Sequence, residues 1–118
     1  MAESVKEQLE CLEISMDEAK KAIKRKDCLV KLQKNRAFIE LIEEGFLKEH
    51  AIRQVMLKSH PGLQEEKIQK TLDQNITAIG AFKQYLINVY NEGMNAEQAL
   101  RDDEATQEEL LQEDALNG

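Results

Sequence analysis

The sequence predicts an all-α protein, and three observations support this. Charged residues make up 33% of the 118 residues and aromatic residues only 4%. Glu, Lys, Gln, Leu and Ala, which favour helices, are abundant, whereas the β-branched and aromatic residues that favour strands are scarce. Apolar residues recur at alternating spacings of four and three in two long segments, as in helices that pack side by side. We expect a long N-terminal heptad helix, two short helices, a second long helix, and a short acidic tail that is either helical or disordered.

The first periodic segment carries the candidate self-association seam. Its apolar positions are Val5, Leu9, Leu12, Met16, Ala19 and Ile23. Lys26 interrupts the next core position, and Val30 resumes the pattern. A helix of about 30 residues extends about 45 Å, which is longer than the diameter of a small helical core. We therefore expect residues 1–34 to form a coiled-coil-like helix whose seam packs against another chain or against a second long helix.

Residues 35–94 are expected to form a compact helical core. Asn35 can cap a short helix that ends at Gly45 in a left-handed conformation. A second short helix follows and is stopped by Pro61 and Gly62. The side chains expected to build the core of one protomer are Phe38, Ile42, Val55, Ile79, Phe82 and Leu86.

The second long helix is expected over residues 64–91, with Gly93 closing it. Its apolar seam is interrupted once, by Asn75, which either fixes the register of an oligomer or lies at the rim of the seam. Gly80 lies near its centre. Because glycine costs up to about 1 kcal/mol in a helix relative to alanine, Gly80 indicates that another backbone crosses closely there.

Residues 95–118 form the predicted acidic tail. Residues 97–118 hold eight acidic residues and one basic residue, Arg101. This segment therefore accounts for the whole formal net charge of −7. Its short apolar sets are too small to stabilise a helix alone, so we expect the tail to be mobile until it docks. The candidate acidic surface comprises Asp102, Asp103, Glu104, Glu108 and Glu109.

A basic block precedes the core, because residues 20–36 contain eight basic residues and one acidic residue, Asp27. One interpretation is a solvated helix that pairs with an acidic segment of its own chain or of a neighbouring copy. The other is a nucleic-acid surface, which the lack of interleaved aromatic residues and the acidic charge of the whole chain disfavour. The candidate partner or anion-binding surface comprises Lys20, Lys21, Lys24, Arg25 and Lys31.

No combination of residues indicates catalysis, and we expect no enzyme activity, cofactor or metal. His50 and His60 are the only histidines and lie ten residues apart, outside any metal-binding spacing. Cys11 and Cys28 lie about 25 Å apart on one predicted helix, so we expect free thiols. The scattered glycines form no phosphate-binding loop.

The sequence also predicts a soluble, cytosolic protein that does not contact a membrane. The longest uncharged stretch near the middle of the chain, residues 74–82, is far shorter than the roughly 20 apolar residues of a membrane span. No apolar run follows the N-terminus as a signal peptide would require.

Residues 32–57 read LQKNRAFIELIEEGFLKEHAIRQVML. This stretch combines a Leu-x-x-Asn sequence, an aromatic residue at Phe38, a Glu-Glu-Gly-Phe turn and an arginine in the following helix. In this combination, residues 30–100 resemble small helical proteins encoded among the structural genes of tailed bacteriophages. The resemblance implies a virion component or an assembly factor in the cytoplasm of an infected bacterium, with other phage or host proteins as partners.

Two functions follow from these expectations. The first is a non-enzymatic, self-associating protein that forms homo-oligomers and acts in phage assembly or as a scaffold-like or core-like part of the particle. The second is a small acidic regulator or inhibitor whose tail carboxylates occupy a basic groove on a host protein.

Overall fold

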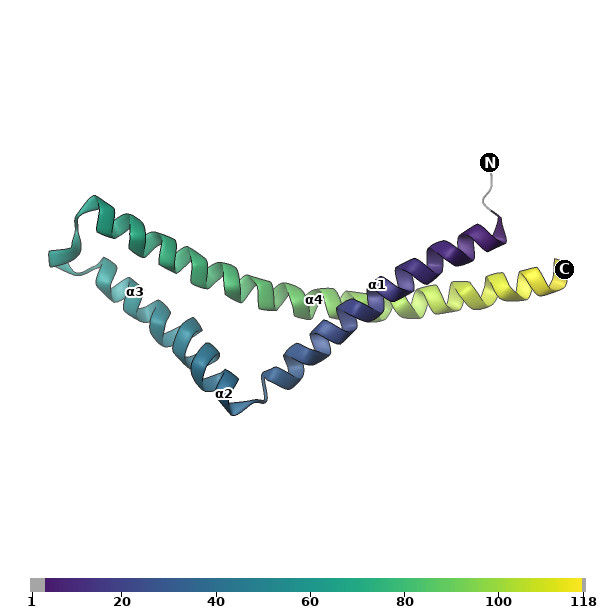
Figure 1. Ribbon diagram of the computed structural model, residues 1–118, viewed down its shortest axis with the longest axis horizontal. Coiled ribbons are helices and arrows are strands. Elements are labelled where there is room, and N and C mark those ends of the chain that lie inside the picture. Colours follow the sequence, from purple (N-terminus) through teal and green to yellow (C-terminus); the bar gives the residue numbers. More distant parts are fainter. Residues whose placement is uncertain (1–3, 118) are drawn as a thin grey trace. The chain divides into compact units, whose positions relative to one another are not determined.

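The computed structural model describes residues 4–117 and confirms an all-α fold, with no strand in this range. Six helical elements follow one another along the chain (Figure 1): α1 (Val5–Leu32), α2 (Arg36–Phe38), η1 (Ile39–His50), α3 (Ala51–Lys58), η2 (Pro61–Leu63) and α4 (Glu66–Asn117). The chain divides into two compact units. Unit 1 contains the described parts of residues 1–28 and 89–118, and unit 2 contains residues 29–88. These units differ from the predicted division at 1–34, 35–94 and 95–118.

Unit 1 is an antiparallel pair formed by most of α1 and the second half of α4 (Figure 1). The Ser15 hydroxyl donates a hydrogen bond of 2.8 Å to Oδ2 of Asp103, whereas Lys26, further along α1, reaches back to Glu97. Met16 and Ala19 of α1 are buried, as is Ala96 of α4. The two helices therefore bury one stripe each against the other.

The prediction that the second long helix ends at Gly93 is wrong. Helix α4 continues through this glycine to Asn117, so the acidic segment is the second half of a long helix. Gly93 is buried and has no left-handed backbone, since no described glycine has a positive φ. Its missing side chain makes room for Lys26, because a Cβ atom at Gly93 would overlap the Lys26 side chain. The segment is weak as an isolated helix, but α1 covers its apolar stripe.

Unit 2 pairs a continuous helical segment, residues 36–58, with the first half of α4. The Asn35 cap is confirmed, because its side-chain oxygen accepts a hydrogen bond of 3.1 Å from the backbone N–H of Phe38. The predicted helix end at Gly45 is wrong, since the chain continues there as the π-helix η1. In this wider helix a Cβ atom at Gly45 would lie 3.0 Å from the carbonyl oxygen of Glu40.

Three contacts fix the antiparallel pairing inside unit 2. Phe46 meets Phe82 edge to face, with ring centroids 5.7 Å apart. Asn75 donates a hydrogen bond of 3.0 Å to the buried Gln54, and Lys58 forms an ion pair with Asp73. Asn75 therefore serves the protomer itself through a polar contact between the two helical segments.

The turn between these segments is closed by side-chain amides. The Gln69 amide donates hydrogen bonds to the carbonyl oxygens of Lys58, at 3.0 Å, and Leu63, at 2.7 Å. His60 caps η2 by accepting a hydrogen bond of 2.9 Å from the backbone N–H of Gly62. Helix α3 ends at Lys58, before the Pro-Gly pair, as its sequence predicts.

The close approach predicted at Gly80 is also absent. Gly80 is exposed, and nothing lies within 4 Å of the position that its Cβ atom would take. The tight glycine contact in α4 is at Gly93, thirteen residues further along the helix.

Candidate association surfaces

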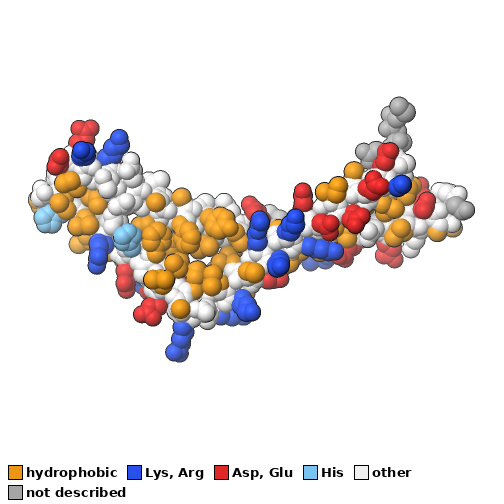
Figure 2. All heavy atoms as spheres, viewed as in Figure 1, with side chains coloured by type: hydrophobic (Ala, Val, Ile, Leu, Met, Phe, Trp, Pro, Cys, Tyr) orange, Lys and Arg blue, Asp and Glu red, His pale blue; other side chains and the backbone are white. Residues whose placement is uncertain are grey.

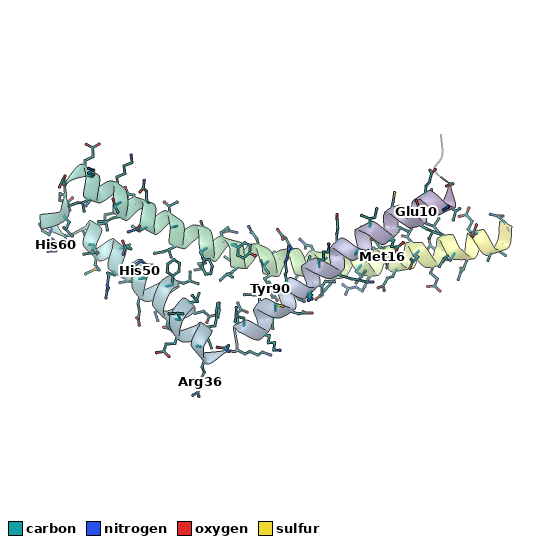
Figure 3. All side chains as sticks on the ribbon, viewed as in Figure 1. Glu10, Met16, Arg36, His50, His60 and Tyr90 are labelled. Atoms are coloured by element: carbon teal, nitrogen blue, oxygen red, sulfur yellow. The ribbon has the colours of Figure 1, made fainter. Side chains whose placement is uncertain are left out.

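The predicted self-association seam lies against the chain's own second long helix. Met16 and Ala19 are each only 8% exposed, and Figure 3 places Met16 between α1 and the second half of α4. Leu12 shares a shallow groove with Thr106 and Leu110 of α4. Nearer the start of α1, Val5 and Leu9 line a similar groove with α4 residues, and Ile23 is half-buried. Of the two partners that the sequence left open for this seam, the structure therefore uses the intramolecular one.

Lys26 lies at a core position of the α1 seam. From its charge, we expected it to interrupt the apolar pattern there. Its side chain is 11% exposed, and its ammonium group donates a hydrogen bond to Oε1 of Glu97. The sulfur of Met94 lies 3.9 Å from the same nitrogen. The hydrogen bond from Lys26 to Glu97 raises the pKa of Lys26, although burial acts in the opposite direction. The charge is thus satisfied inside the chain and holds the two helices in one alignment.

Sequence reasoning missed this contact, although a signal for it was present. Gly93 and Glu97 lie four residues apart, so they are on neighbouring turns of the same face of α4. Gly93 leaves room because it has no side chain, and Glu97 supplies a carboxylate. A lysine at an apolar position of a partner helix fits such a pair, because its stem needs room and its ammonium group needs a counter-ion.

The basic block is exposed on α1, where Figure 2 shows Lys and Arg side chains gathered. In residues 4–117, the ion pairs join Lys26 to Glu97 and Asp27, Lys48 to Glu44, and Lys58 to Asp73. None of these pairs uses a member of the candidate partner surface, which is Lys20, Lys21, Lys24, Arg25 and Lys31. Apart from Lys26, the basic residues of this block therefore form no ion pairs within residues 4–117.

The acidic surface lies along the second half of α4. Asp102, Glu104, Glu108 and Glu109 are exposed, whereas Asp103 is half-buried and accepts the hydrogen bond from Ser15. Because α4 runs antiparallel to α1, these carboxylates lie beside the acidic first half of α1 and not beside the basic block. The two candidate charged surfaces thus occupy different parts of unit 1.

An apolar face on α3 is exposed, which the sequence did not predict. Ile52, Val55 and Met56 are 55%, 54% and 67% exposed, and their spacing places them on one side of the helix. The prediction that Val55 belongs to the protomer core is wrong, because the neighbouring Gln54, at 5% exposure, takes the buried position. The π-helix η1 changes the number of residues per turn, so the helix face expected from regular α-helical spacing is rotated.

The histidine and cysteine side chains do not come together in one site. His50 stacks on Phe46 within one helical segment, whereas His60 lies in the turn before η2 (Figure 3). Cys11 and Cys28 are free and exposed. Within the described range, no group of three or more His, Cys, Asp or Glu side chains is placed to hold a metal ion. The same residues include no helix with the length and apolar character needed to cross a membrane.

Comparison with known proteins gives no family for this chain. No protein-family model, curated protein or solved structure matches it.

Proposed function

We propose that the chain is a non-enzymatic, self-associating helical protein of a tailed phage, acting as a structural part of the particle or as an assembly factor in the infected cell. The observation that carries self-association is the exposed apolar face of α3, Ile52, Val55 and Met56. The phage setting is supported by the resemblance of residues 32–57 to small helical phage proteins.

Units built from two paired helical segments bury little apolar surface, which favours association. Each unit pairs two helical segments, and such a pair can bury only one stripe of each helix. None of the described side chains is less than 2% exposed. A partner that covers apolar side chains would supply the burial that a two-helix layer lacks.

Covering the α3 face alone supplies a net free energy of at most about 6 kcal/mol, which corresponds to a weak dimer. Full burial of an aliphatic side chain contributes about 1.5–3 kcal/mol, and these three are slightly more than half exposed. Covering them therefore contributes about 2–5 kcal/mol per copy, and about twice that in a two-fold pair. Association costs at least about 4 kcal/mol, so the net affinity depends on this face being covered well.

The test compares the mass in solution of the wild-type chain with that of an Ile52→Asp/Met56→Asp variant by size exclusion with light scattering. We expect an oligomer for the wild type and a monomer of unchanged helicity for the variant, because both side chains point away from α4. A Gln84→Asp/Asn88→Asp variant adds the same charge at exposed positions of α4 and should remain oligomeric. A wild-type chain that is monomeric at all concentrations would remove the proposal.

A further inference from the structure

Unit 1 separates its charges along its length. Its acidic end, residues 4–18 with 101–117, holds twelve acidic and two basic residues. The remainder of the unit, residues 19–28 with 89–100, holds five basic and three acidic residues. The antiparallel pairing produces this separation, because it places the acidic start of α1 beside the acidic end of α4.

Apart from Lys26, Asp27 and Glu97, the charged residues of unit 1 have no ion-pair partner within residues 4–117. No ion pair in the described part of the chain involves a residue of the acidic end. Side-by-side helices of like charge repel each other, which costs stability unless opposite charge is supplied from outside the pair. The same unit carries an exposed basic block, which is the matching sign.

The outer face of α1 carries both signs in one stripe. Glu10, Ile14, Asp17, Lys21, Lys24 and Cys28 follow one another at spacings of four and three, and all six are exposed. Buried Met16 and Ala19 mark the opposite side of the helix, which faces α4. The outer stripe therefore points away from unit 1, with acidic residues and Ile14, 63% exposed, in its first half and basic residues in its second half.

We propose that a second copy of the chain docks antiparallel along this outer stripe, so that the acidic half of each copy meets the basic half of the other. A two-fold axis near the middle of the stripe pairs Asp17 with Lys21 of the other copy, and brings Glu10 close to the other copy's Lys24 and Cys28. A parallel arrangement would instead place like charges together. This inference rests on the proposed self-association and adds to the α3 face a second contact, on α1, together with the orientation of the two copies there.

A second copy fits better than nucleic acid does. The stripe extends about 27 Å and is acidic over half of that length, so a phosphate backbone along it would be repelled by one half. When two copies are related by a two-fold axis, the acidic half of each stripe faces the basic half of the other. An isologous interface requires such a self-complementary surface. Because Ile14 is its one large apolar side chain, this contact orients the association and makes it dependent on salt.

The two exposed cysteines report the orientation directly in the wild-type chain. Cys11 and Cys28 lie about 25 Å apart on α1, so a short bismaleimide cannot join them within one copy. In the antiparallel pair, Cys28 of one copy faces Glu10 of the other, so Cys11, the next residue along α1 and at the edge of the stripe, lies at nearly the same height as Cys28. We expect mass spectrometry of the cross-linked dimer to find the Cys11–Cys28 peptide pair. Pairs of Cys11 with Cys11 or of Cys28 with Cys28, or no cross-link between copies, would overturn the inference.

Charge reversal tests the contact by mixing two variants. Lys21→Glu/Lys24→Glu and Glu10→Lys/Asp17→Lys should each weaken self-association by about tenfold or more, since the ion pairs of both halves become like-charge contacts. An equimolar mixture of the two variants should regain association, because their stripes are complementary. A Lys67→Glu/Lys70→Glu control changes the same number of exposed lysines in unit 2 and should have no effect.

The outcomes separate this inference from the proposed function. Wild-type oligomers that resist salt and both reversals would overturn the inference and leave self-association standing. A monomeric wild-type chain would overturn both. Retention of the monomeric chain on duplex DNA at low salt, lost in Lys21→Glu/Lys24→Glu, would assign the basic block to nucleic acid instead.

Discussion

Replacing Gly93 with alanine tests how closely Lys26 of α1 packs on α4 in unit 1. Gly93 lies in the interior of α4, where a glycine is unfavourable for the helix itself. A Cβ atom at this position would lie 2.8 Å from Cγ and 2.9 Å from Cδ of Lys26. Both distances are shorter than carbon atoms adopt in ordinary contact, so α1 and α4 would have to move apart.

Gly80 supplies the matched control, because it lies in the same helix with nothing within 4 Å of its Cβ position. Gly80→Ala should raise the free energy of unfolding by about 1 kcal/mol through helix propensity alone. Gly93→Ala gains the same amount, but the added methyl group in a filled contact costs about 1–3 kcal/mol. The two variants should therefore differ by about 1–3 kcal/mol, with Gly93→Ala the less stable.

The assay is urea unfolding followed by circular dichroism at one protein concentration, because the proposed self-association would make apparent stability depend on concentration. Hydrogen exchange of α1 amides adds a local measure and should show faster exchange in Gly93→Ala only. Lys26→Ala should not relieve the conflict, since alanine keeps the Cβ atom that overlaps. Equal stability of the two glycine variants would refute the close packing of α1 on α4 at this point.

Two further predictions concern polar contacts inside the units. The raised pKa of Lys26 means that its ion pair contributes fully below the ordinary lysine pKa and is lost as pH rises through the raised value, so urea midpoints should fall at high pH in the wild type. Lys26→Met should remove that pH dependence, and a persisting slope would assign it to other groups. In unit 2, Gln54→Leu should cost about 1–3 kcal/mol by leaving the Asn75 amide without its partner. Adding Asn75→Leu should recover most of that loss, and a double variant no better than the single one would count against the pairing.

Features that depend on neighbouring residues were predicted well. Composition fixes the all-α class, Asn35 caps its helix through a contact three residues away, and α3 ends just before Pro61. Each of these follows from local backbone geometry, which the sequence specifies directly.

Features that depend on distant residues were predicted poorly. The acidic segment has too little apolar surface to be helical alone, and only the cover provided by α1 explains a helix that reaches Asn117. Gly45 has the sequence pattern of a helix end, yet the π-helix passes through it. That π-helix then decides which side of α3 is buried, so Gln54 faces α4 and Val55 is exposed, an outcome that regular spacing could not predict.

The contact between Lys26, Gly93 and Glu97 also determines the charge pattern on which the proposed association rests. Moving α1 along α4 by one heptad would place Leu86 or Leu100 opposite Lys26, where a large side chain would occupy the space that Gly93 leaves. The position of Glu97 would then be taken by Tyr90 in the first case and by Glu104 in the second. Of these three alignments, only the observed one gives Lys26 both room and a counter-ion. The same alignment places the acidic end of α4 beside the acidic start of α1 and leaves the basic block exposed. A buried lysine inside unit 1 thereby sets which charges the unit presents to a second copy.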